Sequence, residues 1–221
     1  MTTRRALVVR GGWEGHAPVE STDLFIPFLR AHGFDVQVED SLEVYADEPY
    51  MSTVDLIVQC WSIGEILADE MHGLRVAVEN GAGLAGWHGG LIDAFRNATD
   101  YQHLIGAQFV AHPDDFIEHT VEISPDRSDH PIVEGVSQIS ITSEQYWVLS
   151  DGASDVLATT THVPREDSPW HSPVTVPAVW TRSWGRGHVF ACTIGHSPAE
   201  LEIPEVRTII ERGMLWAART A

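Results

Sequence analysis

Short apolar runs and segments of helical periodicity follow one another through the first 100 residues. Four runs predict strands: Ala6–Arg10, Phe34–Val38, Asp55–Gln59 and Gly83–Trp87. Apolar residues at helical spacing predict one helix that includes Leu24, Phe28 and Leu29, a second along Leu67–Val78, and a third in the segment 91–98. Strands separated by helices predict an open, largely parallel α/β sheet with helices on both faces. Such sheets bind ligands in the loops at the carboxyl ends of the strands.

After about residue 100 the pattern becomes β-rich. Phe116–Ile123 alternates strictly, which places His119 on the apolar face of a strand. Further strands are expected at Ile139–Ile141, Val156–Thr159, Val176–Ser183 and His188–Ile194. The last two are joined by a short glycine-containing turn, which predicts a hairpin, and a terminal helix is expected over Pro204–Ala217. We find no repeat or linker, so we predict one domain, residues 1–221, with a β-rich second half.

Composition and charge restrict the partners. The 221 residues are 43% apolar, enough for one well-filled core. The formal net charge of −19 repels phosphate backbones and anionic membranes, so nucleic acid and membrane are not expected as partners. No apolar run approaches the ~20 residues of a spanning helix, and the first residues lack a signal-peptide pattern. We therefore expect a cytoplasmic protein, in which the two cysteines stay reduced.

The segment Gly86-Trp87-His88-Gly89-Gly90 has the pattern of a strand-to-helix elbow, in which small residues permit a tight turn that presents the central side chain. The central residue here is His88. In hydrolases and amidotransferases an elbow of this kind presents Ser or Cys as the nucleophile, so acyl-enzyme chemistry at this elbow is not expected. A glycine-rich turn with an incidental histidine is the alternative interpretation.

Several motifs occur together in one order along the chain. They are Gly86–Gly90, Tyr101 with Leu104–Phe109 and His112, His130–Ile132 with Gly135, Thr142–Tyr146, Gly185–Phe190 and Thr193–His196. In this combination the sequence resembles the ThuA-like, or trehalose-utilisation, family over nearly its whole length. The resemblance implies a flavodoxin-like fold akin to the class I glutamine amidotransferases and an association with sugar catabolism. It implies no settled reaction.

The likeness to amidotransferases can be examined residue by residue. His88 matches the elbow position at which those enzymes carry the catalytic Cys, and His196 falls where their late strand presents the triad His. Cys60 and Cys192 lie at neither position and are expected to be small buried residues. The resemblance therefore implies an amidotransferase-like pocket without its nucleophile, and we do not expect a glutamine amidotransferase.

The catalytic candidates are His88, Glu144 and His196. The two histidines follow different strands and should meet at one edge of the sheet, with Glu144 as their carboxylate. As general acid and base these groups can move protons on a sugar. As ligands, His88, His119, Glu144 and His196 are candidates for Zn²⁺ or another divalent metal, although no local metal motif decides between the two uses. A hydrogen-bonded core histidine is the alternative interpretation of His119.

Substrate-binding candidates lie in the expected carboxyl-end loops and beside them. They are Trp13, His16, Trp87, His112, His119 and Tyr146. Aromatic faces suit the C–H faces of a sugar ring, so a small-molecule carbohydrate is the expected partner, although many of the eight Trp must be core. A homodimer is the commonest assembly and therefore the default.

Two hypotheses on function follow. The first is an enzyme of carbohydrate catabolism, a hydrolase, lyase or isomerase, that acts on a disaccharide or an oxidised (keto) sugar through the His/Glu site. The second is a non-catalytic sugar-binding or regulatory module with a degenerate amidotransferase fold. Titratable groups gathered in one pocket favour the first, and histidines buried with satisfied hydrogen bonds favour the second.

Overall fold

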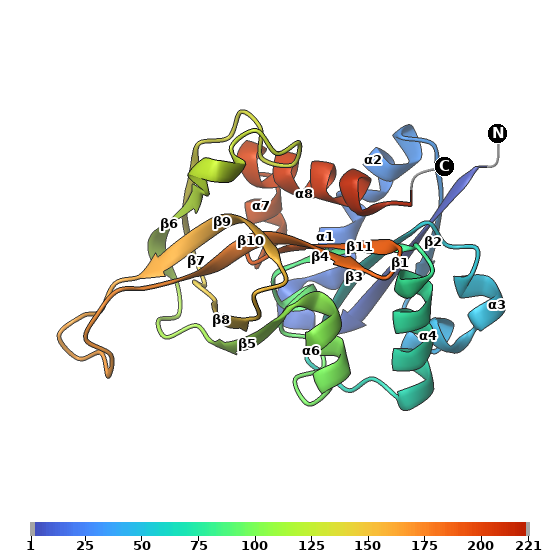
Figure 1. The fold of residues 1–221 in the computed structure, drawn as a ribbon, viewed down its shortest axis with the longest axis horizontal. Coiled ribbons are helices and arrows are strands. Elements are labelled where there is room, and N and C mark those ends of the chain that lie inside the picture. The colour runs from blue at the N-terminus through green and yellow to red at the C-terminus, as the bar shows by residue number, and fades with distance from the viewer. Residues whose placement is uncertain (1–2, 220–221) are drawn as a thin grey trace.

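A nine-stranded mixed sheet forms the centre of the computed structural model, which describes residues 3–219 (Figure 1). Its strand order is β2-β1-β3-β4-β11-β10-β9-β6-β7, and β5 and β8 form a separate two-stranded sheet. The strands are β1 (Arg4–Gly12), β2 (Phe34–Glu39), β3 (Leu56–Ser62), β4 (Gly83–Trp87), β5 (Ala107–Ala111), β6 (Ile117–Ile123), β7 (Gln138–Ser143), β8 (Trp147–Ser150), β9 (Asp155–His162), β10 (Val174–Trp184) and β11 (Gly187–Cys192).

Five strands are adjacent in the order β2-β1-β3-β4-β11, and each is parallel to the next in this series. This is the strand order of flavodoxin-like sheets. Their ligand sites lie at the carboxyl ends of the strands, at the point in the sheet where the strand order reverses. Strands β3 and β4 are almost wholly buried because helices cover both of their faces. The α/β class with an open sheet and helices on both faces is confirmed.

Helices lie on both faces of the sheet. They are α1 (Pro18–Asp23), α2 (Ile26–Ala31), α3 (Glu48–Met51), α4 (Ala68–Glu79), α5 (His88–Leu91), α6 (Thr99–Ile105), α7 (Pro198–Leu201) and α8 (Pro204–Ala217), with 3₁₀ turns at Glu14–His16, Leu42–Ala46 and Pro125–Arg127. Helices α2, α7 and α8 pack into one core, and α3, α4 and α6 pack into the core on the opposite face (Figure 1). The two cores clamp the parallel strands, which fixes the positions of the strand ends.

The second half of the chain extends the sheet with antiparallel strands. The expected hairpin is confirmed, since β10 and β11 pair antiparallel with Ser183 opposite His188. Strand β10 then pairs with β9, β9 with β6, and β6 with the edge strand β7. The segment 163–173 links β9 to β10 and contains no helix or strand.

Two helix predictions differ from the structure. The helix expected around Leu24–Leu29 is two short helices, α1 and α2, with Pro27 in the first turn of α2, where its missing N–H costs no hydrogen bond. The helix expected over the segment 91–98 ends at Leu91 instead. Phe95 has φ +48°, and a helix cannot continue through the left-handed region.

Within residues 3–219 no helix is long and apolar enough to cross a bilayer.

Candidate functional site

The turn from β4 into α5 presents His88 in a strained backbone conformation. His88 has φ +44°, an uncommon conformation for any residue with a side chain. Its glycine neighbours permit close packing: a Cβ on Gly86 would lie 2.6 Å from the backbone oxygen of Gln59, and one on Gly90 would lie 2.8 Å from Cα of Cys60. The sequence forms the expected elbow because only glycine fits at these two positions.

Both ring nitrogens of His88 have partners. Nδ1 lies 2.7 Å from the carbonyl oxygen of Thr193, and Nε2 lies 3.1 Å from Oε2 of Glu144. A carbonyl oxygen can only accept, so Nδ1 carries a proton and donates it. In the neutral ring Nε2 then carries no proton, and its lone pair faces a carboxylate oxygen. That arrangement needs a second proton or a cation between the two atoms.

Two further histidines reach the same carboxylate region. His196 follows β11, and its Nδ1 lies 3.4 Å from Oε2 of Glu144 but makes no hydrogen bond. His16 lies at the end of the 3₁₀ turn after β1, with Nδ1 2.7 Å from Oγ of Ser62. The rings of His16, His88 and His196 approach one another edge to face, with centroids 4.8 to 5.3 Å apart.

Four side chains therefore offer ligand atoms around one point. One nitrogen each of His16, His88 and His196 and one carboxylate oxygen of Glu144 all lie within 4.8 Å of one another. In a tetrahedral zinc site with bonds of about 2.1 Å, ligand atoms are about 3.4 Å apart. Small side-chain movements would bring the ligand atoms from these separations to those of a tetrahedral site. Three imidazoles and one carboxylate suit Zn²⁺ or a similar divalent ion.

The electrostatics of the group follow from burial and proximity. Burial lowers the pKa of His16 to about 3, so His16 is neutral at pH 7. Burial acts to raise the pKa of Glu144, but the neighbouring His196 and His88 outweigh it and hold that pKa well below its usual range. Glu144 in turn raises the pKa of His196. The carboxylate is therefore ionised and the histidine beside it is basic.

A small cavity of about 150 Å³ opens beside this group. Its lining residues are Trp13, His16, Ile63, Asp93, Arg96, His112, Glu144 and Tyr146. Nε2 of His112 lies 3.7 Å from the other oxygen of Glu144, and Tyr146 stacks on His88 at 4.1 Å. Trp13 is 49% exposed and packs edge to face against His16. The expected substrate residues Trp13, His16, His112 and Tyr146 are thus brought together with the expected catalytic ones.

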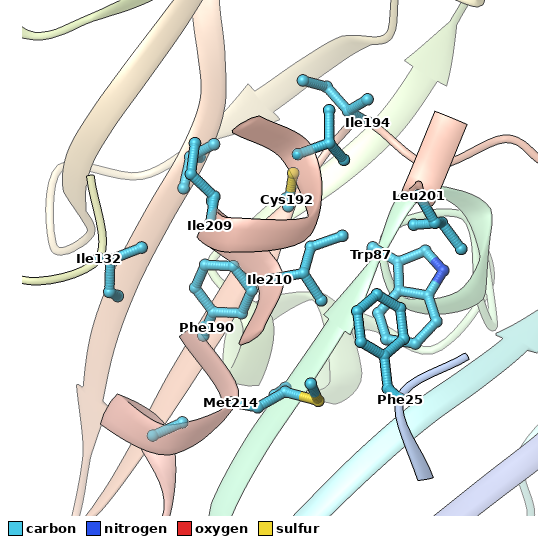
Figure 2. Packing of buried hydrophobic residues seen from close by; sticks show 14 of the residues in the cluster. Phe25, Trp87, Ile132, Phe190, Cys192, Ile194, Leu201, Ile209, Ile210 and Met214 are labelled. Atoms are coloured by element: carbon cyan, nitrogen blue, oxygen red, sulfur yellow. The ribbon is translucent and has the colours of Figure 1, made fainter. Parts of the chain in front are cut away.

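The expectation that Trp87 lines the site does not hold. Its side chain is 1% exposed and packs in the core against Phe25, 4.9 Å between ring centroids. Figure 2 shows Trp87 beside Phe25 and Leu201 among the aliphatic residues of that core. Side chains alternate along a strand, so Trp87, the last residue of β4, points into the core on the α8 face of the sheet.

The structure also separates His119 from the ligand group. His119 lies within β6, and its Nδ1 is 3.0 Å from the carbonyl oxygen of Ile117. It lines a different cavity, of about 410 Å³, together with His162 and Trp170. Strand β6 is separated from β4 by three other strands, so His119 does not share the edge at which β4 and β11 end. The metal candidates brought together are His88, Glu144 and His196, and His16 takes the fourth place.

Neither cysteine is available as a nucleophile in this conformation. Cys60 and Cys192 are each 1% exposed, both are free thiols, and burial raises the pKa of each to about 12. Both belong to one core cluster, as expected.

Sequence reasoning missed three features of the site. His16 was placed among the substrate residues, although its position after β1, next to β3 in the sheet, puts it at the same edge as His88. Asp93 and Arg96 were not singled out at all. Their Asp-x-x-Arg spacing directly after the elbow was the available signal, because residues three apart in a tight turn lie close together.

The comparisons with known proteins agree with this architecture. A ThuA-like protein from Bacteroides uniformis superposes with a TM-score of 0.77 at 17% identity, covering 97% of this chain and 91% of that one. One from Parabacteroides merdae gives 0.74 at 16% identity, with 100% and 92% covered. A β-galactosidase from Bacillus circulans sp. alkalophilus gives 0.62 at 10% identity, with 98% and 30% covered. At these identities the likeness establishes the fold alone.

The search of curated proteins found no match. The family model for ThuA, described as trehalose utilisation, matches residues 5–217. That match spans nearly the whole chain, and the chain therefore belongs to the ThuA family.

Proposed function

We propose that the protein binds one divalent metal ion, best suited by Zn²⁺, through His16, His88, Glu144 and His196, and acts with it on a carbohydrate in the cytoplasm. The observation that carries the proposal is the convergence of four ligand atoms within 4.8 Å of one another. A disaccharide or an oxidised (keto) sugar is the substrate class, in line with the family's role in trehalose utilisation.

The hydrogen-bond pattern favours a metal over a simple acid/base pair. Nε2 of His88 and Nδ1 of His196 both face the same oxygen, Oε2 of Glu144. With protons alone, one carboxylate oxygen would have to accept from two ring nitrogens, and His88, whose Nδ1 already donates to Thr193, would have to be an imidazolium in a largely buried group. A cation at the centre instead uses every lone pair in the neutral form in which imidazole is a ligand.

The surroundings of the ligands match those of known metal sites. Metal-binding histidines usually direct their second ring nitrogen to a carbonyl, a carboxylate or another polar group, which fixes the ring. His88 donates to Thr193 in this way, and His16 is held by Ser62. The backbone N–H of His196 donates to Oε2 of Glu200, 3.0 Å away, which ties down the loop that carries it.

The remaining cavity residues supply binding and proton transfer. A bound metal would polarise a carbonyl or hydroxyl oxygen of the substrate as a Lewis acid. His112 lies at the second oxygen of Glu144 and lines the cavity, so it is placed to give or take a proton at the substrate. Trp13 offers a half-exposed aromatic face for the C–H face of a sugar ring.

The test is a zinc titration of metal-stripped protein by calorimetry, followed by an activity assay on oxidised disaccharides. We expect one ion per chain, activity lost on chelation, and recovery with added Zn²⁺ or Mn²⁺. His88→Asn is the informative variant, because asparagine tolerates φ +44° better than alanine and removes the ligand with less strain. His72→Asn, at an exposed histidine, is the matched control.

Turnover that continues after exhaustive chelation would refute the role of the metal and leave His88 and Glu144 as an acid/base pair. Zinc binding with sugar affinity but no turnover of any sugar would favour the non-catalytic module.

A further inference from the structure

Arg96 and Asp93 form a fixed ion pair in the wall of the candidate site. Nε and Nη2 of Arg96 donate to the two carboxylate oxygens of Asp93 at 2.5 and 2.7 Å, a two-bond arrangement. Asp93 is buried, with 5% of its side chain exposed, whereas the side chain of Arg96 is 51% exposed. Both residues line the cavity that holds Glu144 and Tyr146. The buried carboxylate of Asp93 therefore anchors the guanidinium of Arg96 in the wall of the cavity.

Several contacts hold this guanidinium in place. Arg96 lies over the ring of Phe109, with 5.1 Å from its Cζ to the ring centroid. Its backbone oxygen accepts a hydrogen bond from Nε2 of Gln102 at 2.6 Å. The pKa of Arg96 is raised, above all by the hydrogen bond to Asp93, so the group keeps its charge. An arginine that is fixed before a ligand arrives loses little entropy on binding it.

Backbone strain is concentrated around the same cavity. The structure describes four residues other than glycine with positive φ: Ala17, Ile63, His88 and Phe95. Ile63 lines the cavity, and Ala17 and Phe95 are direct chain neighbours of lining residues. His88 is itself a proposed metal ligand. Ile63, at φ +59°, is β-branched and is a genuine outlier. Its N–H bonds the oxygen of Asp93, and its own oxygen accepts from the N–H of Phe95. Such strain persists where the surrounding structure enforces it, most often at functional sites.

The geometry leaves one edge of the guanidinium free. Nε and one N–H of Nη2 are used by Asp93, and the second N–H of Nη2 and both of Nη1 remain as donors. Asp93 neutralises the charge, so the pair offers donors without a net charge. The chain as a whole carries −19, which disfavours an anionic ligand.

We propose that Arg96, positioned by Asp93, is the residue that selects the substrate by donating to hydroxyl or carbonyl oxygens of one neutral sugar unit. This inference rests on the proposed function and deepens it. The cavity of about 150 Å³ is smaller than the ~300 Å³ at which pockets for larger ligands begin. It therefore admits one sugar ring, with the second unit of a disaccharide outside. Asp93 acts through Arg96 and is a positioning residue.

The experiment measures zinc and sugar binding separately in the same zinc-loaded protein. The probes are glucose, trehalose and their keto forms, with gluconate as the anionic comparison. Arg96→Gln should weaken binding of the neutral sugars about tenfold or more, the loss expected for hydrogen bonds from a charged donor, and should leave zinc affinity unchanged. Asp93→Asn should weaken sugar binding less, because Arg96 keeps its charge but loses its fixed position. Arg75→Gln removes a comparable ion pair, to Glu79 at 2.7 Å on α4, and should change neither.

Arg96→Lys provides a second variant if Arg96→Gln destabilises the fold. It keeps the charge and loses the planar donors, so it should also lose sugar affinity. Unchanged sugar binding in correctly folded Arg96 variants would overturn the proposal, and so would tighter binding of gluconate than of glucose. Wild-type protein that binds zinc but none of the neutral sugars would remove the carbohydrate function itself, and this inference with it.

Discussion

The Nδ1–H of His88 donates to the carbonyl oxygen of Thr193, 2.7 Å away, and this contact joins the elbow after β4 to the end of β11. Because the two strands are parallel neighbours, the bond fixes the ring across the edge where both strands end. It also fixes the tautomer, so that the lone pair of Nε2 faces Glu144. The fold thus sets the chemistry of His88 through a backbone atom, which a side-chain substitution at Thr193 would not remove.

A methyl group at Gly89 should damage the site without disturbing the core. A Cβ there would lie 2.1 Å from Cε1 and 2.3 Å from Nδ1 of His16, so His16 must move away from Ser62. We expect Gly89→Ala to lower zinc affinity by about 10- to 100-fold, the effect of losing a partner that orients a ligand. The measurement is calorimetric titration with Zn²⁺.

Gly152→Ala is the matched control, because a Cβ at Gly152 meets nothing within 4 Å. It should bind zinc like the wild type. Equal zinc affinity in Gly89→Ala and Gly152→Ala would show that His16 is not a ligand.

Two tryptophans expected at the site should behave in opposite ways. Trp87 is 1% exposed in the core, so Trp87→Ala should lower the free energy of unfolding by about 3–5 kcal/mol. Trp13 is 49% exposed, so Trp13→Ala should change stability by less than about 1 kcal/mol but weaken sugar binding. Urea unfolding and sugar titration of both variants provide the check. A Trp13 variant with unchanged sugar affinity would remove Trp13 from the binding surface.

Part of the site could be predicted from the sequence. The runs of apolar residues predict parallel strands, and the carboxyl ends of parallel strands lie at one edge of the sheet. The proximity of His88 and His196 could therefore be predicted. Glu144 was assigned to the site from the family pattern, and Tyr146 because it is an aromatic residue near the expected carboxyl-end loops. The alternation of side chains along β4 was a further signal, because Ala85 and Trp87 belong to one core and Leu84 to the other. Trp87 could therefore have been assigned to the core.

Other parts of the site depend on tertiary structure. His119 was grouped with the ligands because its strand alternates well, but alternation does not give the place of a strand in the sheet. That place, beyond β9 and next to the edge strand β7, follows from antiparallel pairings that no local pattern specifies. The Asp93–Arg96 pair is similar, since its place beside Glu144 depends on how the segment after the elbow folds back onto Ile63.

Metal-free protein should lose stability as the pH falls below about 6.5. Burial lowers the pKa of His162, whose Nε2 lies 3.2 Å from the oxygen of Tyr146. The unfolded chain therefore binds a proton at a pH where the folded protein does not. The stabilising contribution is complete above the unfolded pKa and is lost as the pH falls toward the folded pKa, by up to about tenfold in the folding constant per pH unit. His16 adds to this loss, whereas the raised pKa of His196 opposes it.

The measurement is urea unfolding with a chelator at pH 7.5 and 5.5. His162→Gln keeps an N–H donor but does not titrate, so its stability should fall less than that of the wild type between these two values. A wild type and a variant with the same pH dependence would refute the assignment to His162.

The two thiols should be inert in the folded protein. Cys60 and Cys192 are each 1% exposed with pKa values raised to about 12, so neither reaches a reagent or forms a thiolate near neutral pH. We expect no reaction with Ellman's reagent in native buffer and two thiols per chain in denaturant. Because the elbow after β4 presents His88 rather than a Ser or Cys nucleophile, the protein should also release no ammonia from glutamine, before or after treatment with iodoacetamide. A native thiol that reacts quickly, accompanied by a glutaminase activity that the alkylation abolishes, would contradict both the burial of the thiols and the proposed metal-based chemistry.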